Sequence, residues 1–201
     1  MQEVELKFSL ADREEFERAR KILGRPKRAA VQVNHYFVGD PKGRLDRGEA
    51  LLRLRVKAEG AVLTFKDGLK KTGALYECRE VEGEVSPAAA QDLLAGRRSP
   101  LDLDTEASLA ACEALGGGSP RIAGASETER AVYDLAGADA LLLDRTRFPG
   151  GREDYEIEIE TLDPPSAEAA AWCLFGIAGI VLKPQTRTKV ARFLAAIAGT
   201  S

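Results

Sequence analysis

The amino-acid sequence predicts an α+β protein in which antiparallel strands form one sheet and helices flank it. Two observations lead to this fold class. Several segments alternate between charged and apolar residues, the period of a β-strand whose two faces differ. Other segments combine a cap, apolar residues at helical spacing and a glycine or proline boundary, which are the signals of amphipathic helices. Residues 50–66 are typical of a hairpin that turns at Glu59-Gly60.

The predicted elements cover nearly the whole chain. The first helix begins after the capping sequence SLAD (9–12) and stops at Gly24, and turn formers fill 39–48. Later helices open at SP (86–87) and at PPS (164–166). Strands are expected over residues 2–8, 31–38, 50–57, 76–85, 120–134, 139–147 and 153–162, with the second arm of the hairpin reaching residue 66. The helices that open at these two signals are expected over residues 88–95 and 167–178, and two more helices are expected over 104–115 and 187–198.

Length and composition suit one domain of 201 residues with a helical insertion over 86–118 between strands. The net charge of -3 argues against a nucleic-acid partner, and no apolar run approaches the length of a membrane span. The three cysteines form no CxxC pair and the N-terminus has no signal-peptide pattern, so we expect reduced thiols in the cytoplasm. The single histidine, His35, argues against Ser–His catalysis and a His-based zinc site.

The polar faces of the predicted strands are charged rather than merely hydrophilic. The acidic positions are Glu3, Glu5, Glu80, Glu82, Asp144, Glu156, Glu158 and Glu160. The basic positions are Lys7, Arg53, Arg55, Lys66 and Arg130. The alternation alone fits an open antiparallel sheet with one face on helices and the other in water. It also fits a barrel closed with the charged face inward and helices over its apolar outside.

Ladders of like charge, both acidic and basic, favour the barrel. Like charges side by side destabilise a sheet unless a counter-ion lies between them. The acidic ladders, Glu3–Glu5 and Glu156–Glu158–Glu160, therefore require a cation, and the basic ladder, Arg53–Arg55, requires an anion. Guanidinium groups match phosphate oxygens, and carboxylates match Mg²⁺ or Mn²⁺, which also bind phosphate. A complex of a polyphosphate with divalent metal satisfies both kinds of ladder at once.

Six short motifs, in order, resemble the CYTH superfamily of triphosphate tunnel metalloenzymes. They are Glu3-x-Glu5-x-Lys7; NHYF (34–37) followed by LLRLR (51–55); LTFK (63–66); REVE (79–82); Asp144 followed by YEIEIE (155–160); and Thr188-Lys189 at the start of the last helix. The resemblance covers roughly residues 2–195 and implies a closed antiparallel barrel of eight strands with a charged interior, in a single CYTH-like domain over 1–201. Lys183 is the alternative to Lys189, and Ala140 and Leu142 depart from the family pattern.

The resemblance also implies roles for the charged residues. Phosphate would be held by Arg53, Arg55, Lys66, Arg130 and Lys189. Two Mg²⁺ or Mn²⁺ ions would be held by Glu3, Glu5, Asp144, Glu156, Glu158 and Glu160, with Glu156 nearer the tunnel mouth and Glu80 or Glu82 as further candidates for the second ion. Catalytic roles would fall to Lys7, Lys66, Glu80 and Glu82.

The implied activity is metal-dependent hydrolysis of a triphosphate, either inorganic tripolyphosphate or a nucleoside or thiamine triphosphate. One alternative is a class IV adenylyl cyclase that makes cyclic AMP from ATP, although no adenine pocket can be recognised in the sequence. The second alternative is a non-catalytic polyphosphate-binding module, against which the many carboxylates argue. The expected partner is a small-molecule triphosphate, and the sequence leaves a monomer and a homodimer equally open.

Overall fold

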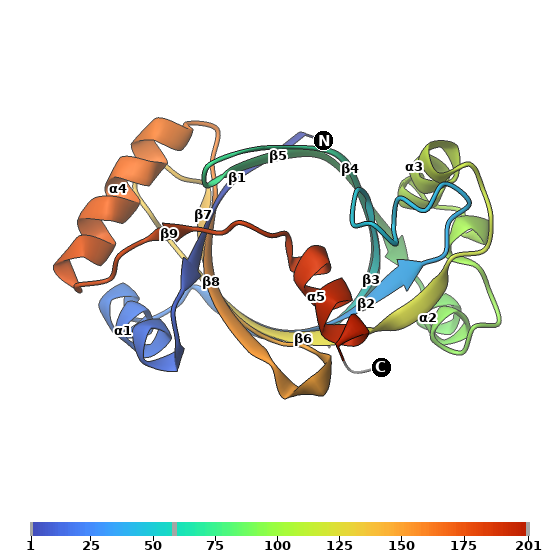
Figure 1. The fold of residues 1–201 in the computed structure, drawn as a ribbon, viewed down its shortest axis with the longest axis horizontal. Helices are drawn as coiled ribbons and strands as arrows, with labels where there is room; N and C mark the ends of the chain where they lie inside the picture. Colours follow the sequence, from blue (N-terminus) through green and yellow to red (C-terminus); the bar gives the residue numbers. More distant parts are fainter. Residues whose placement is uncertain (1, 58–59, 200–201) are drawn as a thin grey trace.

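The computed structural model describes residues 2–57 and 60–199 and shows a closed antiparallel barrel (Figure 1). Its strands are β1 (Gln2–Leu10), β2 (Arg28–Val38), β3 (Leu51–Lys57), β4 (Gly60–Thr72), β5 (Leu75–Val85), β6 (Arg121–Tyr133), β7 (Ala140–Arg147) and β8 (Glu153–Glu160). They run in the order β5-β4-β3-β2-β6-β7-β8-β1, and pairing of β1 with β5 closes the ring. The open solvated sheet is therefore the wrong one of the two interpretations, and the closed eight-stranded barrel is confirmed.

Helices cover the outside of the barrel on two opposite sides (Figure 1). The helices are α1 (Arg13–Leu23), α2 (Pro87–Leu94), α3 (Glu106–Leu115), α4 (Pro164–Ile177) and α5 (Lys189–Ala198), with short 3₁₀ turns η1 (Pro100–Asp102) and η2 (Pro149–Gly151). Helices α1 and α4 lie beside β1, β7 and β8, whereas α2 and α3 lie beside β3, β4 and β5. Among the described residues, every helix is too short or too polar to cross a membrane.

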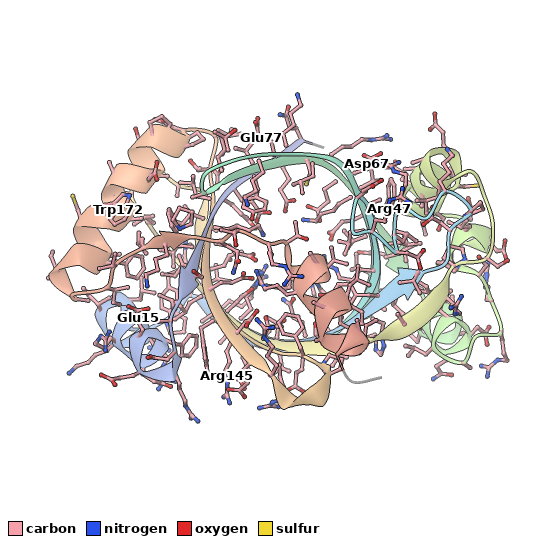
Figure 2. The ribbon with its side chains drawn as sticks, in the orientation of Figure 1. Glu15, Arg47, Asp67, Glu77, Arg145 and Trp172 are labelled. Atoms are coloured by element: carbon pink, nitrogen blue, oxygen red, sulfur yellow. The ribbon has the colours of Figure 1, made fainter. Side chains whose placement is uncertain are left out.

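The alternation of the strands places apolar side chains outward, under the helices. One core cluster includes Leu6, Phe8 and Ile157, which pack against α1 and α4. A second cluster includes Leu54 and Phe65, which pack against α2 and α3. Because side chains on a strand point alternately to opposite faces, burial of these residues under helices sends their charged neighbours into the barrel. Figure 2 shows side chains filling the ring, while Arg145 and Trp172 lie outside it.

The helix boundaries follow from local capping. Asp12 accepts a hydrogen bond from the backbone N–H of Glu15, and Gly24 ends α1, as the sequence predicts. Ser86 caps α2 in the same way. The predicted turn of the 50–66 hairpin falls partly on residues 58–59, which lie outside the described residues, and the pairing of Lys57 with Gly60 places the hairpin ends side by side. A two-residue strand, β9 (Lys183–Pro184), pairs with β1 and was not expected from the sequence.

Helix α5 differs from the other helices because it lies over one end of the ring rather than along its outside (Figure 1). Thr188 caps the helix by accepting a hydrogen bond from Ala191. The ring of Phe193 packs against that of Tyr36 on β2, with 4.4 Å between the ring centroids. The segment leading into α5 is held by Tyr76, whose hydroxyl donates to the carbonyl oxygen of Gln185. These contacts fix the first turn of α5 over the barrel interior.

Candidate active site

Strand register brings the predicted charged residues together inside the barrel. Lys66 lies opposite Glu80, and Glu5 lies opposite Glu160 on the neighbouring strand. They surround a cavity of about 250 Å³. The charged residues lining it are Glu3, Glu5, Lys7, Glu49, Arg53, Arg55, Lys66, Asp67, Glu80, Glu82, Arg130, Glu158, Glu160 and Lys189. Asp144 and Glu156 do not line this cavity, although their side chains face the barrel interior.

One side of the interior is rich in carboxylates. We call it the carboxylate wall, and it consists of Glu5, Asp144, Glu156, Glu158 and Glu160 on β1, β7 and β8. Most of its charge is balanced by cations. Lys189 Nζ lies 2.7 Å from Asp144 Oδ2, 2.6 Å from Glu156 Oε1 and 3.2 Å from Glu158 Oε1. Its ammonium group therefore occupies the kind of position that a bound cation would take.

Two arginines complete the neutralisation of this wall. Arg130 donates to both carboxylate oxygens of Asp144, at 2.8 and 2.6 Å, and to Glu158 at 2.6 Å. Arg192, one turn beyond Lys189 in α5, donates to Glu156 at 2.5 Å. Burial tends to raise the pKa of Asp144, but Arg130 and Lys189 lower it below the usual value. Glu156 was expected nearer the tunnel mouth than Glu158 and Glu160; its carboxylate is covered by α5, which lies over one end of the barrel, and the residue is only 2 % exposed.

Two carboxylates of this wall are less well compensated. Glu5 and Glu160 face each other across β1 and β8, and Lys7, at 2.8 Å, is the cation that pairs with Glu5. Burial raises the pKa of Glu5 against the effect of Lys7, and Glu158 adds to the rise. Burial also raises the pKa of Glu160, against Arg130 and with Glu158. Both ionised groups would gain from a divalent cation placed between them.

Three of the six predicted metal ligands lie close together in the structure. Among the described residues, Asp144, Glu156 and Glu158 form a triad whose ligand oxygens all lie within 4.8 Å of one another. The predicted ligands Glu3, Glu5 and Glu160 are not members of that triad, and Lys7 joins Glu5 to it by lying 2.8 Å from Glu5 and 3.1 Å from Glu158. Oxygen-only ligands in this number suit a hard divalent ion, so the donor chemistry fits Mg²⁺ or Mn²⁺. The lysine contacts of these carboxylates would have to rearrange for such an ion to bind.

Opposite the carboxylates lies a region that we call the arginine wall, formed by Asn34, Arg53, Arg55 and Thr64 on β2, β3 and β4. Arg53 is 7 % exposed, and its Nη2 donates to Thr64 Oγ1 at 3.3 Å. Its Nε is buried without a hydrogen-bond partner among the described residues. Arg55 donates to the amide oxygen of Asn34 at 3.2 Å. Over the same described residues, neither guanidinium has a carboxylate within ion-pair distance.

The electrostatics agree with this lack of partners. Burial, followed by repulsion from Arg53 and Arg130, lowers the pKa of Arg55 to about 9. An arginine keeps its proton at neutral pH even so, and Glu82 and Glu80 offset the effects of burial and of the neighbouring cations only in part. A buried charge without a partner is costly, so this pair of arginines provides a strong site for an anion.

A third cluster joins the two walls. Lys66 Nζ lies 2.5 Å from Glu3 Oε2 and 3.1 Å from Glu80 Oε1. Burial raises the pKa of Glu3, but Lys66 and the thiol of Cys78 together lower it to about 2. Glu82, nearer solvent, accepts a hydrogen bond from Thr64 at 2.8 Å.

Similarity to known proteins agrees with this architecture. The CYTH domain family matches residues 1–194. The chain belongs to the CYTH family. The structure of a candidate adenylyl cyclase from Hippeastrum, described as having a dominant triphosphatase activity, is 25 % identical and has a TM-score of 0.85, with 96 % of this chain and 95 % of that chain covered. None of the curated proteins matches the chain at a significant level.

More distant CYTH-like structures share the fold alone. A candidate adenylate cyclase from Bacillus halodurans is 24 % identical, with a TM-score of 0.74 over 96 % of this chain and 98 % of that one. A Mimivirus capping-enzyme triphosphatase is 11 % identical, with a TM-score of 0.52 over 88 % of this chain and 90 % of that one. The CYTH barrel is therefore preserved here at low sequence identity.

Sequence reasoning missed several residues of the site. Arg192, Cys78 and Tyr76 all contact the charged interior. The alternation could have indicated two of them, because Tyr76 and Cys78 share the face of Glu80. Arg192 lies three positions after Lys189, so it is on the same side of a helix. Lys183, the alternative to Lys189, is exposed in β9.

Proposed function

We propose that this CYTH protein hydrolyses a triphosphate with the help of divalent metal ions bound in its tunnel. The observation that carries the proposal is the pair formed by the buried Arg53 and the partly buried Arg55, which have no carboxylate ion-pair partner among the described residues and lie across a small cavity from a wall of carboxylates. Such a site complements an anion and, on the opposite side, cations that the anion brings with it. The similar protein from Hippeastrum, with its dominant triphosphatase activity, supports the same reaction class.

The residues divide the work by charge. Arg53 and Arg55 would hold the phosphate oxygens and stabilise negative charge that shifts during phosphoryl transfer. Glu3, Glu5, Glu158 and Glu160 would bind the metal. Asp144 and Glu156 could also become ligands if the ammonium group of Lys189 moved away from them. A bound divalent ion supplies charge neutralisation and an activated water. Lys7 and Lys66 stay protonated because neighbouring carboxylates raise the pKa of each despite burial, so they position groups rather than remove protons.

The size of the cavity favours a compact substrate. Pockets for drug-sized ligands have volumes of about 300–1,000 Å³, whereas this cavity has about 250 Å³. Its two aromatic residues are already engaged: the ring of Tyr36 packs on Phe193, and the ammonium groups of Lys7 and Lys71 lie 5.7 and 5.6 Å from the centre of the Tyr76 ring. Stacking of an adenine or thiamine ring on either residue would have to displace these contacts. We therefore propose inorganic tripolyphosphate as the preferred substrate over ATP and thiamine triphosphate.

Product analysis tests this proposal. The purified protein is incubated with Mg²⁺ or Mn²⁺ and, separately, with tripolyphosphate, ATP and thiamine triphosphate, and phosphate, pyrophosphate and cyclic AMP are measured. The expected result is phosphate release, fastest from tripolyphosphate and abolished by a chelator. Cyclic AMP with pyrophosphate from ATP would instead establish a cyclase. Binding of tripolyphosphate without turnover of any substrate would establish a binding module.

A further inference from the structure

A second concave site lies on the outside of the barrel, away from the tunnel. Helix α1 stands beside the outer faces of β2, β6 and β7, and a groove of about 1160 Å³ runs between them. Small side chains, Ala29 and Ala131, contribute to the groove, together with Leu143 and Phe16. The groove is therefore apolar in the part where helix and sheet meet.

One residue that lines this groove, Tyr133, has a polar atom without a partner among the described residues. Tyr133 is 4 % exposed, and its hydroxyl is buried without a hydrogen-bond partner among the described residues. Buried hydroxyl groups are normally hydrogen-bonded, and an orphaned one is destabilising. The ring of Tyr133 belongs to the core under α1, but its hydroxyl is left as a donor for something that the chain itself does not provide.

The charge around the groove is positive, although the whole protein is acidic. Arg13, Arg20, Lys21 and Arg145 outnumber the carboxylates Glu17 and Glu129 at this site. Arg130 also borders the groove through its strand, but its guanidinium faces the tunnel. Within the described part of the chain, Arg13 and Lys21 form no ion pair, whereas Arg20 pairs with Glu17 at 2.9 Å. Arg145 pairs with Glu129 at 3.3 Å and with Glu153 at 2.7 Å, so the uncompensated charge of the groove lies on Arg13 and Lys21. Arg20 lies close enough to Tyr133 to oppose the rise in the pKa of the phenol that burial causes.

We propose that this groove binds a small amphipathic anion, with its apolar body against Ala29, Ala131 and Leu143 and its acidic group beside the hydroxyl of Tyr133 and the cations of α1. An uncharged ligand would leave the cations without a role, and a fully hydrophilic anion such as a polyphosphate would gain nothing from the apolar floor. The site lies behind the strands β6 and β7, whose opposite faces carry Arg130 and Asp144 into the tunnel. It is nevertheless independent of the proposed hydrolysis.

A matched pair of fluorescent probes tests this site. 8-Anilinonaphthalene-1-sulfonate and N-phenyl-1-naphthylamine share an aromatic body, and only the first carries an acid group. We expect the sulfonate probe to bind the folded protein saturably at one site and at least tenfold more tightly than the neutral probe. Equal affinity of the two probes, or no saturable binding, would overturn the proposal. Displacement of the probe by tripolyphosphate would also overturn it, because the probe would then be in the tunnel.

Substitutions locate the probe. Tyr133→Phe removes only the unpartnered hydroxyl, so the fold is retained and sulfonate binding weakens about fivefold, the effect of one hydrogen bond. Arg20→Gln combined with Lys21→Gln weakens sulfonate binding at least tenfold and leaves the neutral probe unaffected. Arg97→Gln, which lies outside the groove and pairs with Asp92, is the control and should change neither affinity. If the groove variants bind the sulfonate as the native protein does, the proposed site is wrong, whatever the outcome of the hydrolysis assays.

Discussion

The two walls of the tunnel carry opposite charges, and they differ more in how those charges are compensated than in how deeply they are buried. On the carboxylate wall, Asp144 and Glu158 are surrounded by Arg130 and Lys189 at hydrogen-bonding distances. On the arginine wall, Arg53 has only a hydroxyl, and Arg55 only an amide, as hydrogen-bond partners among the described residues. Both sets of side chains face the same barrel interior.

This difference distinguishes charged residues that stabilise the fold from charged residues that bind a ligand. A buried ion pair whose partners are both present is close to neutral for stability, but removing one partner is expensive. A buried charge without a partner is expensive from the start and persists where a ligand compensates it. The ion-pair network around Asp144 therefore mainly stabilises the fold of the ligand-free protein, whereas the charges of Arg53 and Arg55 are compensated when a ligand binds. The following predictions test that division.

The largest effect is expected when the arginine wall loses both charges. Arg53→Gln with Arg55→Gln should lower kcat/KM for tripolyphosphate at least about 1,000-fold, since two charge-assisted contacts of about 2 kcal/mol each are lost. The thermal midpoint of the ligand-free variant should stay the same or rise, because no ion pair is broken. Phosphate-release kinetics and calorimetry measure the two quantities, with Arg97→Gln on the surface as control. Activity within tenfold of the native value would show that phosphate binds elsewhere.

A somewhat smaller loss is expected on the less compensated part of the carboxylate wall. Glu5→Gln should reduce metal-dependent turnover about 100-fold or more without unfolding the protein, because the variant removes a metal ligand. Mg²⁺ should raise the melting temperature of the native protein but not that of the variant. Glu77→Gln, on the outer face of β5 (Figure 2), is the matched control. Unchanged turnover in Glu5→Gln would rule out the proposed metal site.

The compensated part of the same wall should respond mainly in stability. Arg130→Gln leaves the fully buried carboxylate of Asp144 short of its bidentate partner, so the free energy of unfolding should fall by about 3–5 kcal/mol. Urea denaturation measures this change, and the double variant with Asp144→Asn should recover part of it. A native-like stability for Arg130→Gln would remove the contrast between the two walls.

An exterior ion pair provides the smallest effect and the reference for the others. Arg145 and Tyr155 donate to Glu153, and these hydrogen bonds lower the pKa of Glu153 to about 2 against a small effect of burial. Because the folded pKa lies below the unfolded value, the stability from Glu153 is present above about pH 4.5 and is lost as pH falls towards 2. Glu153→Gln should lower the melting temperature at pH 7 by about 2 °C. The difference from the native protein should vanish at low pH in thermal melts, and a difference that grows there would contradict this account.

Much of the fold could be predicted from local pattern. The alternation over 2–8, 50–57 and 153–162 indicates the strands and the residues that share a face, because the side-chain period of a strand is two. Capping residues located α1 and α2 to within a residue or two. The sequence left open whether the charged face pointed to water or inward, since an open sheet and a closed barrel have the same alternation.

The candidate site divides in a similar way. Charge type along each strand was enough to nominate Arg53, Arg55 and the glutamates as ligands of a phosphate–metal complex. The ion-pair partners of the carboxylates could not be predicted from the sequence, because these contacts join strands and a helix that are far apart in the chain. Lys189 reaches Asp144 across 45 positions and Glu156 across 33 only because α5 lies over the end of the barrel.

By itself, the sequence determined the strands, the helices and the identity of the charged face, because these depend on periodicities and caps within a few residues. The closure of β1 on β5, the burial of Glu156 and the neutralisation of the carboxylate wall were decided by the tertiary structure. So was the charge that remains uncompensated at Arg53 and Arg55. The physical reason is that Coulomb and desolvation energies depend on distances in space, and those exist only after the barrel has closed.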